Sequence, residues 1–174
     1  PVKRIFHDTS VEDWYNWYRY HAADLIERQF QTGVGEISVS VPEFTEGTYS
    51  VPHEPQLDAE LARTLSPATV FYDVGSHYGY FIEFALRAGV EPSNIHAFEV
   101  DKIRCGHLRS EYSGTDVQIN NTRVDSHTET GSTTIDEYAS THAPPDVVKI
   151  DVEGAEGDVI SGMMKTLAVE RPTV

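Results

Sequence analysis

Val70-Phe71-Tyr72-Asp73-Val74-Gly75-Ser76-His77-Tyr78-Gly79 is the stretch of sequence that decides the fold. Its first five residues are bulky and β-prone, which predicts a buried strand. The two glycines that follow predict a tight turn, and the apolar residues after them predict a helix over about residues 80–88. Ligands of open α/β sheets bind beyond the carboxyl ends of the strands. The stretch therefore predicts a turn from a strand to a helix at which a ligand binds.

Strands and helices alternate after this turn. Further strands are expected at residues 95–99, 117–120 and 147–151. Two further helices are expected, one capped by Asp101 and running to about Tyr112, the other starting near Ala155 and carrying Val159, Ile160, Met163, Met164 and Leu167. Helical crossovers of this length predict an α/β fold whose sheet is mainly parallel and is covered by helices on both faces. Another strand is expected to begin at Thr173-Val174, so the sheet is expected to be cut short there.

The first third of the chain is predicted to be an extension. Apolar residues recur at helical spacing over residues 11–30, with Ser10 as the N-cap. Residues 37–41 alternate with period two and predict a strand, residues 42–55 predict a loop or irregular hairpin, and residues 58–65 predict a short helix. We expect residues 1–67 to form a helix and β-hairpin extension, and residues 68–174 to form the ligand-binding domain.

The composition favours a globular domain with a strongly acidic surface. The 174 residues are 39% hydrophobic, and 28 acidic against 13 basic residues give a formal net charge of -15. This charge repels phosphate backbones and anionic lipids, so nucleic acid and membranes are not expected as partners. The acidity is either ordinary or an adaptation to high salt. We expect a halophilic protein, because the acidic residues are spread along the whole chain.

Cysteine and histidine usage exclude two further classes of site. Cys105 is the single cysteine, so no disulfide framework is expected. No signal peptide and no apolar run of membrane-spanning length is recognisable, and a cytoplasmic location is expected. Seven of the eight histidines are scattered without ligand spacing, so no metal site is expected. His77, in the turn, is the exception.

Acidic residues end two of the predicted strands. Asp73 suits a ligand with a positively charged amine, although a solvated aspartate at a turn is the simpler alternative. Glu99 stands where a carboxylate can accept both hydroxyls of a ribose, although it could also cap the next helix. The turn lacks the three-glycine spacing of a dinucleotide site and the glycine-lysine pair of a triphosphate site. Together these residues predict a nucleoside pocket beside an amine site, which S-adenosylmethionine or S-adenosylhomocysteine fits.

The segment Val148-Lys149-Ile150-Asp151-Val152-Glu153-Gly154-Ala155-Glu156 is similar to the K-I-D-V-E-G-A-E segment of the FkbM family of methyltransferases. The resemblance extends, in the same order, to the loop at residues 73–79, to Ala97-Phe98-Glu99, to residues 134–138 and to Arg171-Pro172. It covers roughly residues 70–174 and leaves out the part of the chain before them.

The resemblance implies a Rossmann-like class I methyltransferase fold that binds S-adenosylmethionine and methylates a small-molecule acceptor. The family usually methylates oxygen on sugars or other small hydroxylated metabolites. By this resemblance, cofactor binding is expected at Asp73, Gly75, Ser76, His77, Gly79, Phe98, Glu99, Val100, Asn121 and Asp151. The resemblance implies that the turn holds the methionine moiety, that Glu99 holds the ribose, and that Phe98, Val100 and the Asn120-Asn121 region flank the adenine.

Asp151, His77 and Glu153 are the candidate catalytic residues. His77 could accept the proton of an acceptor hydroxyl, or could be no more than a polar loop residue. Asp151 could orient the acceptor hydroxyl, stabilise the sulfonium or pass a proton to His77. Alternatively, it could cap, with Glu153, the helix that starts near Ala155. Two other functions stay open: a module that binds the cofactor without turnover, and an NAD-linked oxidoreductase, which the missing third glycine disfavours. The oligomeric state is also open.

The interval from Asn120 to Ile135 is shorter than expected between the third strand and the segment at residues 134–138. A mobile loop that gates the acceptor is common in enzymes that exclude water. We expect that such a loop is either trimmed in this protein or left out of the sequence. The acceptor molecule is therefore not specified by these residues.

Overall fold

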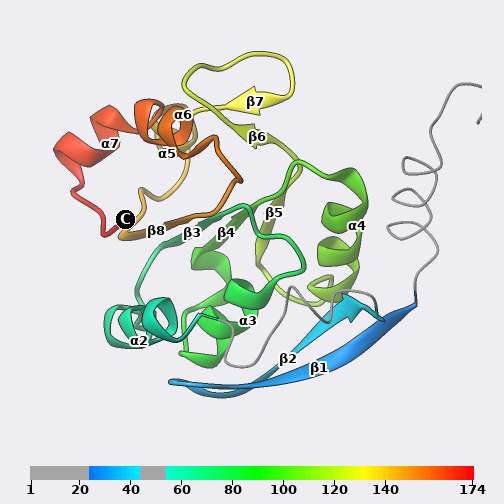
Figure 1. The fold of residues 1–174 in the computed structure, drawn as a ribbon. Helices are drawn as coiled ribbons and strands as arrows, with labels where there is room; N and C mark the ends of the chain where they lie inside the picture. Colours follow the sequence, from blue (N-terminus) through cyan, green and yellow to red (C-terminus); the bar gives the residue numbers. More distant parts are fainter. Residues whose placement is uncertain (1–23, 44–53) are drawn as a thin grey trace, which may run out of the picture.

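The computed structural model describes residues 24–43 and 54–174 (Figure 1). Its centre is a four-stranded parallel sheet with the strand order β5-β4-β3-β8. The strands are β3 (Phe71–Val74), β4 (Ile95–Phe98), β5 (Gln118–Asn120) and β8 (Val147–Ile150). The four strands that the sequence predicts are thus confirmed, as is the parallel α/β fold.

The register of the sheet aligns the carboxyl ends of its central strands. Val74 of β3 pairs with Phe98 of β4 on one side and with Ile150 of β8 on the other. The residues that follow these strands, Gly75, Glu99 and Asp151, therefore emerge at one edge of the sheet. The strands that precede Gly75 and Asp151, β3 and β8, are neighbours in the sheet.

One face of the sheet is covered by helices and by an N-terminal hairpin. The covering elements are β1 (Leu25–Thr32), β2 (Gly35–Pro42), α2 (Pro55–Thr64), α3 (Tyr80–Arg87) and α4 (Lys102–Glu111). Figure 1 shows the hairpin lying across the outside of α3. Side chains of the hairpin and α2, among them Phe30 and Leu61, belong to the same hydrophobic cluster as Phe84 of α3. This cluster joins residues on both sides of the predicted domain boundary at residue 67.

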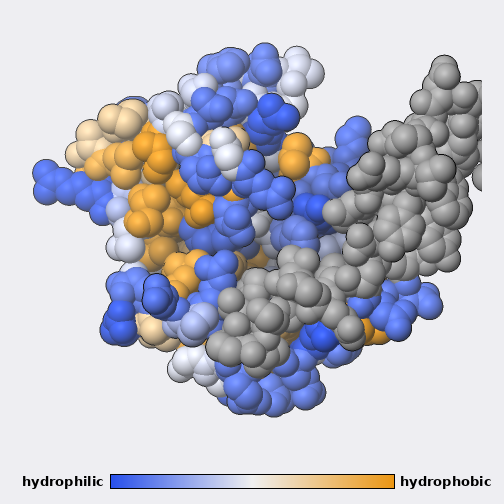
Figure 2. Space-filling view, viewed as in Figure 1, coloured by the Kyte–Doolittle hydropathy of each residue, from blue (hydrophilic) through white to orange (hydrophobic). Residues whose placement is uncertain are grey.

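The other face is covered by shorter elements. They are β6 (Arg123–Val124), β7 (Ser132–Thr133), α5 (Ile135–Ala139), α6 (Glu156–Ser161) and α7 (Met164–Val169). A second cluster forms here around Tyr72, Phe98, Ile135 and Met163. The 3-10 turn η3 (Pro92–Asn94) leads into β4. In Figure 2, hydrophobic surface gathers over the region of α6 and α7.

The helix predicted over residues 11–30 is wrong at its carboxyl end. Residues 25–32 form β1, which pairs antiparallel with β2 so that Phe30 lies opposite Ile37. Ile26 and Phe30 are four residues apart, a spacing that fits a helix face and also every second residue of a strand. Tertiary packing decides between the two, because Phe30 is buried against Tyr80 of α3. Residues 11–23 lie outside the described part of the chain.

The described residues of the extension include a hairpin formed by β1 and β2. The strand expected at residues 37–41 is confirmed as β2, which pairs with β1. Residues 44–53 of the predicted loop or irregular hairpin lie outside the described residues. The predicted helix at residues 58–65 is confirmed as α2, which begins three residues earlier, at Pro55.

The single helix predicted after Ala155 is two helices. The break falls at Gly162, whose carbonyl accepts a hydrogen bond from the Asp136 backbone N–H at 3.0 Å. The carboxylate of Asp136 then accepts the N–H groups of Lys165 and Thr166 at the start of α7. A β-carbon at Gly162 would lie 2.0 Å from the Asp125 carbonyl oxygen, so the close backbone approach requires glycine.

The short interval between β5 and α5 is fully described. It contains β6 and β7, in which Arg123 pairs with Ser132 and Val124 with Thr133. The expected strand at residues 173–174 is confirmed as a parallel bridge between Thr173 and Val147. Among the described residues, no helix combines the length and the apolar character needed to cross a membrane.

Candidate functional site

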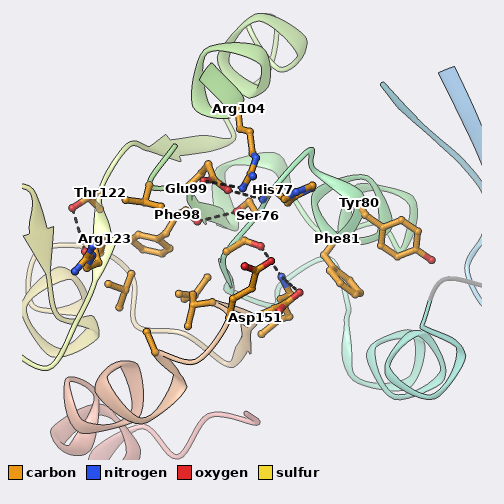
Figure 3. Close-up of a pocket in the computed structure, with 18 of the residues that line it drawn as sticks. Ser76, His77, Tyr80, Phe81, Phe98, Glu99, Arg104, Thr122, Arg123 and Asp151 are labelled. Atoms are coloured by element: carbon orange, nitrogen blue, oxygen red, sulfur yellow. Dashed lines mark hydrogen bonds and ion pairs between the residues drawn. The ribbon is translucent and has the colours of Figure 1, made fainter. Parts of the chain in front are cut away.

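A cavity of about 580 Å³ opens at the carboxyl edge of the sheet (Figure 3). Its walls come from the segments that follow β3, β4, β5 and β8, together with the first turn of α3. The volume lies within the range of small-molecule and cofactor sites. The lining residues include Gly75, Ser76, His77, Tyr80, Phe81, Phe98, Glu99, Val100, Arg104, Thr122, Arg123, Val124, Lys149, Asp151, Val152 and Glu153.

The turn after β3 is held against the end of β4. The backbone N–H groups of Gly75 and Ser76 both donate to the Phe98 carbonyl, at 2.9 and 3.1 Å. The Ser76 hydroxyl donates to the Asp73 carbonyl at 2.8 Å and closes the turn on itself. Gly75 has a φ of +84°, and the Asp151 carbonyl leaves no room beside it for a side chain. The predicted glycine turn is confirmed, with a steric reason for glycine at its first position.

Glu99 is buried at the end of β4 and bridges two loops. One of its carboxylate oxygens accepts the His77 N–H at 2.9 Å, and the other accepts the Asp101 N–H at 2.7 Å. An Arg104 nitrogen lies 3.8 Å from the second oxygen. Burial raises the pKa of Glu99, and these contacts partly offset the effect. Asp101 caps α4, so Glu99 does not serve as the cap of that helix.

Asp73 does not line the cavity. It is fully buried below the turn, where its Oδ1 lies 3.0 Å from Lys149 Nζ. The same ammonium donates to the Gly75 carbonyl at 2.8 Å and lies 5.0 Å from the centroid of the Phe81 ring. No role for Lys149 was predicted from the sequence. The available signal was a lysine between Val148 and Ile150 of a predicted buried strand, which requires a buried partner without naming Asp73 as that partner.

The three candidate catalytic residues line one cavity. His77 has a φ of +51° and Glu153 a φ of +50°, so both belong to sharp turns. The Asp151 side chain is 62% exposed, and Figure 3 shows it across from Glu99 and Ser76. Helix α6 begins without a side-chain cap, and Glu156 accepts the Gly154 N–H. The capping alternative for Asp151 and Glu153 is therefore wrong for α6.

At the opposite end, the cavity is bounded by the segments after β4 and β5. Figure 3 shows Phe98 beside Thr122 and Arg123. Val100 also lines the cavity and is 60% exposed. Asn121 does not line it, because its side-chain amide donates to the carbonyls of Glu99 and Val100 at 2.9 and 3.1 Å. Asn121 thus braces the end of β4 against the end of β5.

Most of the predicted site residues come together at this cavity. Asp73, Gly79 and Asn121 are the ones that lie outside its lining. Gly79 precedes α3 with a φ of +88°, where a β-carbon would lie 2.9 Å from the Tyr112 hydroxyl. The lining also contains residues that were not predicted from the sequence, among them Tyr80, Phe81, Arg104, Thr122, Arg123 and Lys149. The described residues contain no cluster of three or more side chains suited to hold a metal ion.

A parallel α/β sheet with a glycine turn, a buried acidic strand end and a cavity between them is typical of the Rossmann-like fold. Residues 104–174 match the family model of the methyltransferase FkbM domain. This part of the chain is thus similar to the domain of FkbM methyltransferases, which transfer a methyl group from S-adenosylmethionine to an acceptor substrate. No curated protein matches the sequence. The match starts within α4, so it does not reach the glycine turn or Glu99.

Proposed function

We propose that the cavity binds S-adenosylmethionine with the ribose on Glu99. The observation that carries this assignment is a carboxylate, 3% exposed, at the end of β4 and in the wall of a cofactor-sized cavity. Each of its oxygens accepts one backbone N–H, and a carboxylate oxygen has a second acceptor position. A pair of neighbouring ribose hydroxyls complements these two positions.

The ribose position orients the rest of the cofactor along the cavity. Phe98, Val100 and the neighbouring Thr122 and Arg123 flank the adenine on one side of Glu99. The Gly75–His77 turn and Asp151 receive the methionine moiety on the other side. Asn121 supports the adenine end indirectly, through the carbonyls that it binds. Asp73 supports the methionine end in the same indirect way, through Lys149.

The acceptor in this proposal is a small hydroxylated metabolite or a sugar, methylated on oxygen. The bound cofactor supplies an electrophilic methyl group, so the protein has to position the acceptor and remove its proton. His77 is the proposed base at the acceptor oxygen, and Asp151 and Glu153 orient the hydroxyl. All three line the cavity, and Asp151 is open to an incoming molecule.

Transfer of labelled methyl from S-adenosylmethionine tests the proposal. The protein is incubated with a panel of sugars and other small hydroxylated metabolites, and products are identified by mass spectrometry after alkaline treatment. Methyl ethers survive this treatment, whereas methyl esters do not. A base-stable methyl ether that forms only with active protein supports O-methylation. Methyl transfer to nitrogen alone, or reduction of NAD by the same substrates, would contradict it.

A further inference from the structure

The ammonium of Lys149 fills the position expected for an amine of the ligand. It lies between the Asp73 carboxylate, at 3.0 Å, and the Gly75 carbonyl, at 2.8 Å. These two groups are the acceptors that a strand-end aspartate and a glycine turn would offer to an amine of the cofactor. Because the protein fills this position with its own cation, the amino group of the cofactor has to be bound elsewhere.

Lys149 keeps one donor for a ligand. An ammonium has three N–H groups, of which the Gly75 carbonyl takes one and the ion pair with Asp73 a second. The Lys149 side chain is only 4% exposed, yet it belongs to the cavity lining. A cation that is held in place from below and faces a cavity is suited to an anionic ligand group.

Asp151 stands beside Lys149 with the opposite charge. Its Oδ2 lies 4.0 Å from Lys149 Nζ, beyond hydrogen-bonding distance, and its side chain is exposed. An α-amino acid carries its ammonium and its carboxylate on the same carbon atom. A buried, held cation and an exposed anion 4.0 Å apart on one wall therefore complement both groups at once.

The other cations in the described lining have acidic partners of their own. Arg104 lies 3.8 Å from Glu99, and Arg123 lies 3.9 Å from Asp125. Figure 3 places Arg104 beside Glu99 and Arg123 beside Thr122, away from the segment that carries Asp151. In the described lining, Lys149 is thus the cation that lies 4.0 Å from Asp151, whereas Arg104 lies over the Tyr78 ring of the glycine turn.

We infer that Lys149 binds the carboxylate of the amino-acid moiety of the cofactor and that Asp151 binds its amino group. This inference rests on the proposed function, because it takes the ligand to be S-adenosylmethionine or its product. Asp73 has the supporting role: its buried charge holds the ammonium under the Gly75–His77 turn. Recognition of the amino-acid moiety of the cofactor then depends on β8 and the residue that follows it as much as on the glycine turn.

Binding of three ligands by calorimetry tests the inference. S-adenosylhomocysteine carries both groups, its decarboxylated analogue carries only the amine, and 5′-methylthioadenosine carries neither. The variant is Lys149→Met combined with Asp73→Asn, because removing one partner alone would leave a buried unpaired charge. Arg123→Met is the control, since it removes a cation from the adenine end. Circular dichroism and thermal melting establish that each variant is folded.

We expect the parent protein to bind S-adenosylhomocysteine at least about tenfold more tightly than the decarboxylated analogue, equivalent to about 1.4 kcal/mol. In the double variant, the ratio of the affinity for S-adenosylhomocysteine to the affinity for the decarboxylated analogue falls to near one, while the affinity for methylthioadenosine is unchanged. Arg123→Met leaves the ratio unchanged.

A parent protein that binds the decarboxylated analogue as tightly as S-adenosylhomocysteine would overturn the inference without any variant. So would a folded double variant that keeps the ratio, or one that loses all three ligands equally, because Lys149 would then only support the turn. If the parent binds none of the three ligands, the proposed function itself fails.

Discussion

The carbonyl oxygen of Asp151 occupies the space beside the α-carbon of Gly75. A β-carbon at Gly75 would lie 1.9 Å from that oxygen, and Gly75 also has a φ of +84°. The first residue after β3 and the first residue after β8 thus interlock through their backbones. This contact fixes the distance between the turn and the segment that carries the candidate catalytic carboxylates.

Gly75→Ala should damage both folding and cofactor binding. The added methyl group has to displace backbone, so we expect a loss of about 3 kcal/mol or more in the free energy of unfolding. Urea denaturation measures this loss. Gly154→Ala is the matched control, because Gly154 has a φ of +99° but no atom within 4 Å of an added β-carbon. It should cost only the backbone strain, about 1–2 kcal/mol. Equal losses in the two variants would contradict the interlock.

Asp151→Asn should fold normally and lose function. The side chain is 62% exposed, so its charge contributes little to folding. We expect methyl transfer or cofactor affinity to fall at least about tenfold, equivalent to about 1.4 kcal/mol. The exposed Asp116 lies outside the cavity, and Asp116→Asn is the control that should change neither quantity. A folded Asp151→Asn protein with parental binding and turnover would remove Asp151 from the mechanism.

His96 should make stability depend on pH below neutrality. It is 4% exposed, its Nδ1 lies 2.9 Å from the Tyr138 hydroxyl, and burial lowers its pKa to about 4. The unfolded chain takes up a proton near pH 6.5, which the folded protein does not. The stabilisation is therefore complete above pH 6.5 and is lost as the pH falls towards 4.

Urea unfolding at pH 7 and pH 5 measures this loss. Between these values we expect the His96 contribution to fall by about 1–2 kcal/mol. The glutamine side chain in His96→Gln does not titrate. The free energy of unfolding of this variant should therefore fall less than that of the parent over the same pH interval, and the difference should equal the His96 contribution. Every other titrating group is common to both proteins. Equal losses in the two proteins would show that His96 is not held neutral by the fold.

Molar salt should stabilise the protein if its acidity is an adaptation to high salt. The formal net charge of -15 produces repulsion among carboxylates, which salt screens. We expect the melting temperature to rise between low and molar potassium chloride. A melting temperature that stays constant or falls would refute the halophilic interpretation.

The sheet could be predicted from the sequence because its strands carry their own signals. Residues 71–74 and 147–150 are short runs of bulky apolar residues with one charged residue each, and the glycine turn and the Asp101 cap mark where helices begin. These are local features, so a single sequence reveals them. The resemblance to FkbM methyltransferases added the order of the elements and the cofactor.

The features that were not predicted correctly from the sequence depend on contacts between residues that are distant in the chain. Ile26 and Phe30 fit a helix and a strand equally, and only packing on α3 selects the strand. The break at Gly162 arises from its contact with Asp125, which is 37 residues earlier in the chain. The pairing of Asp73 with Lys149 depends on the register of β3 and β8, which propensity does not reveal.

Titration of the parent protein and of its Glu99→Ala variant with S-adenosylhomocysteine tests the central claim most directly. Glu99 stands buried in the cavity wall, and a charged hydrogen bond contributes about 1.5–3 kcal/mol. Calorimetry should show binding to the parent protein, no binding of NAD, and a loss of roughly ten- to a hundredfold in Glu99→Ala. Absence of S-adenosylhomocysteine binding to the parent, or an unchanged affinity in a folded Glu99→Ala protein, would contradict the account.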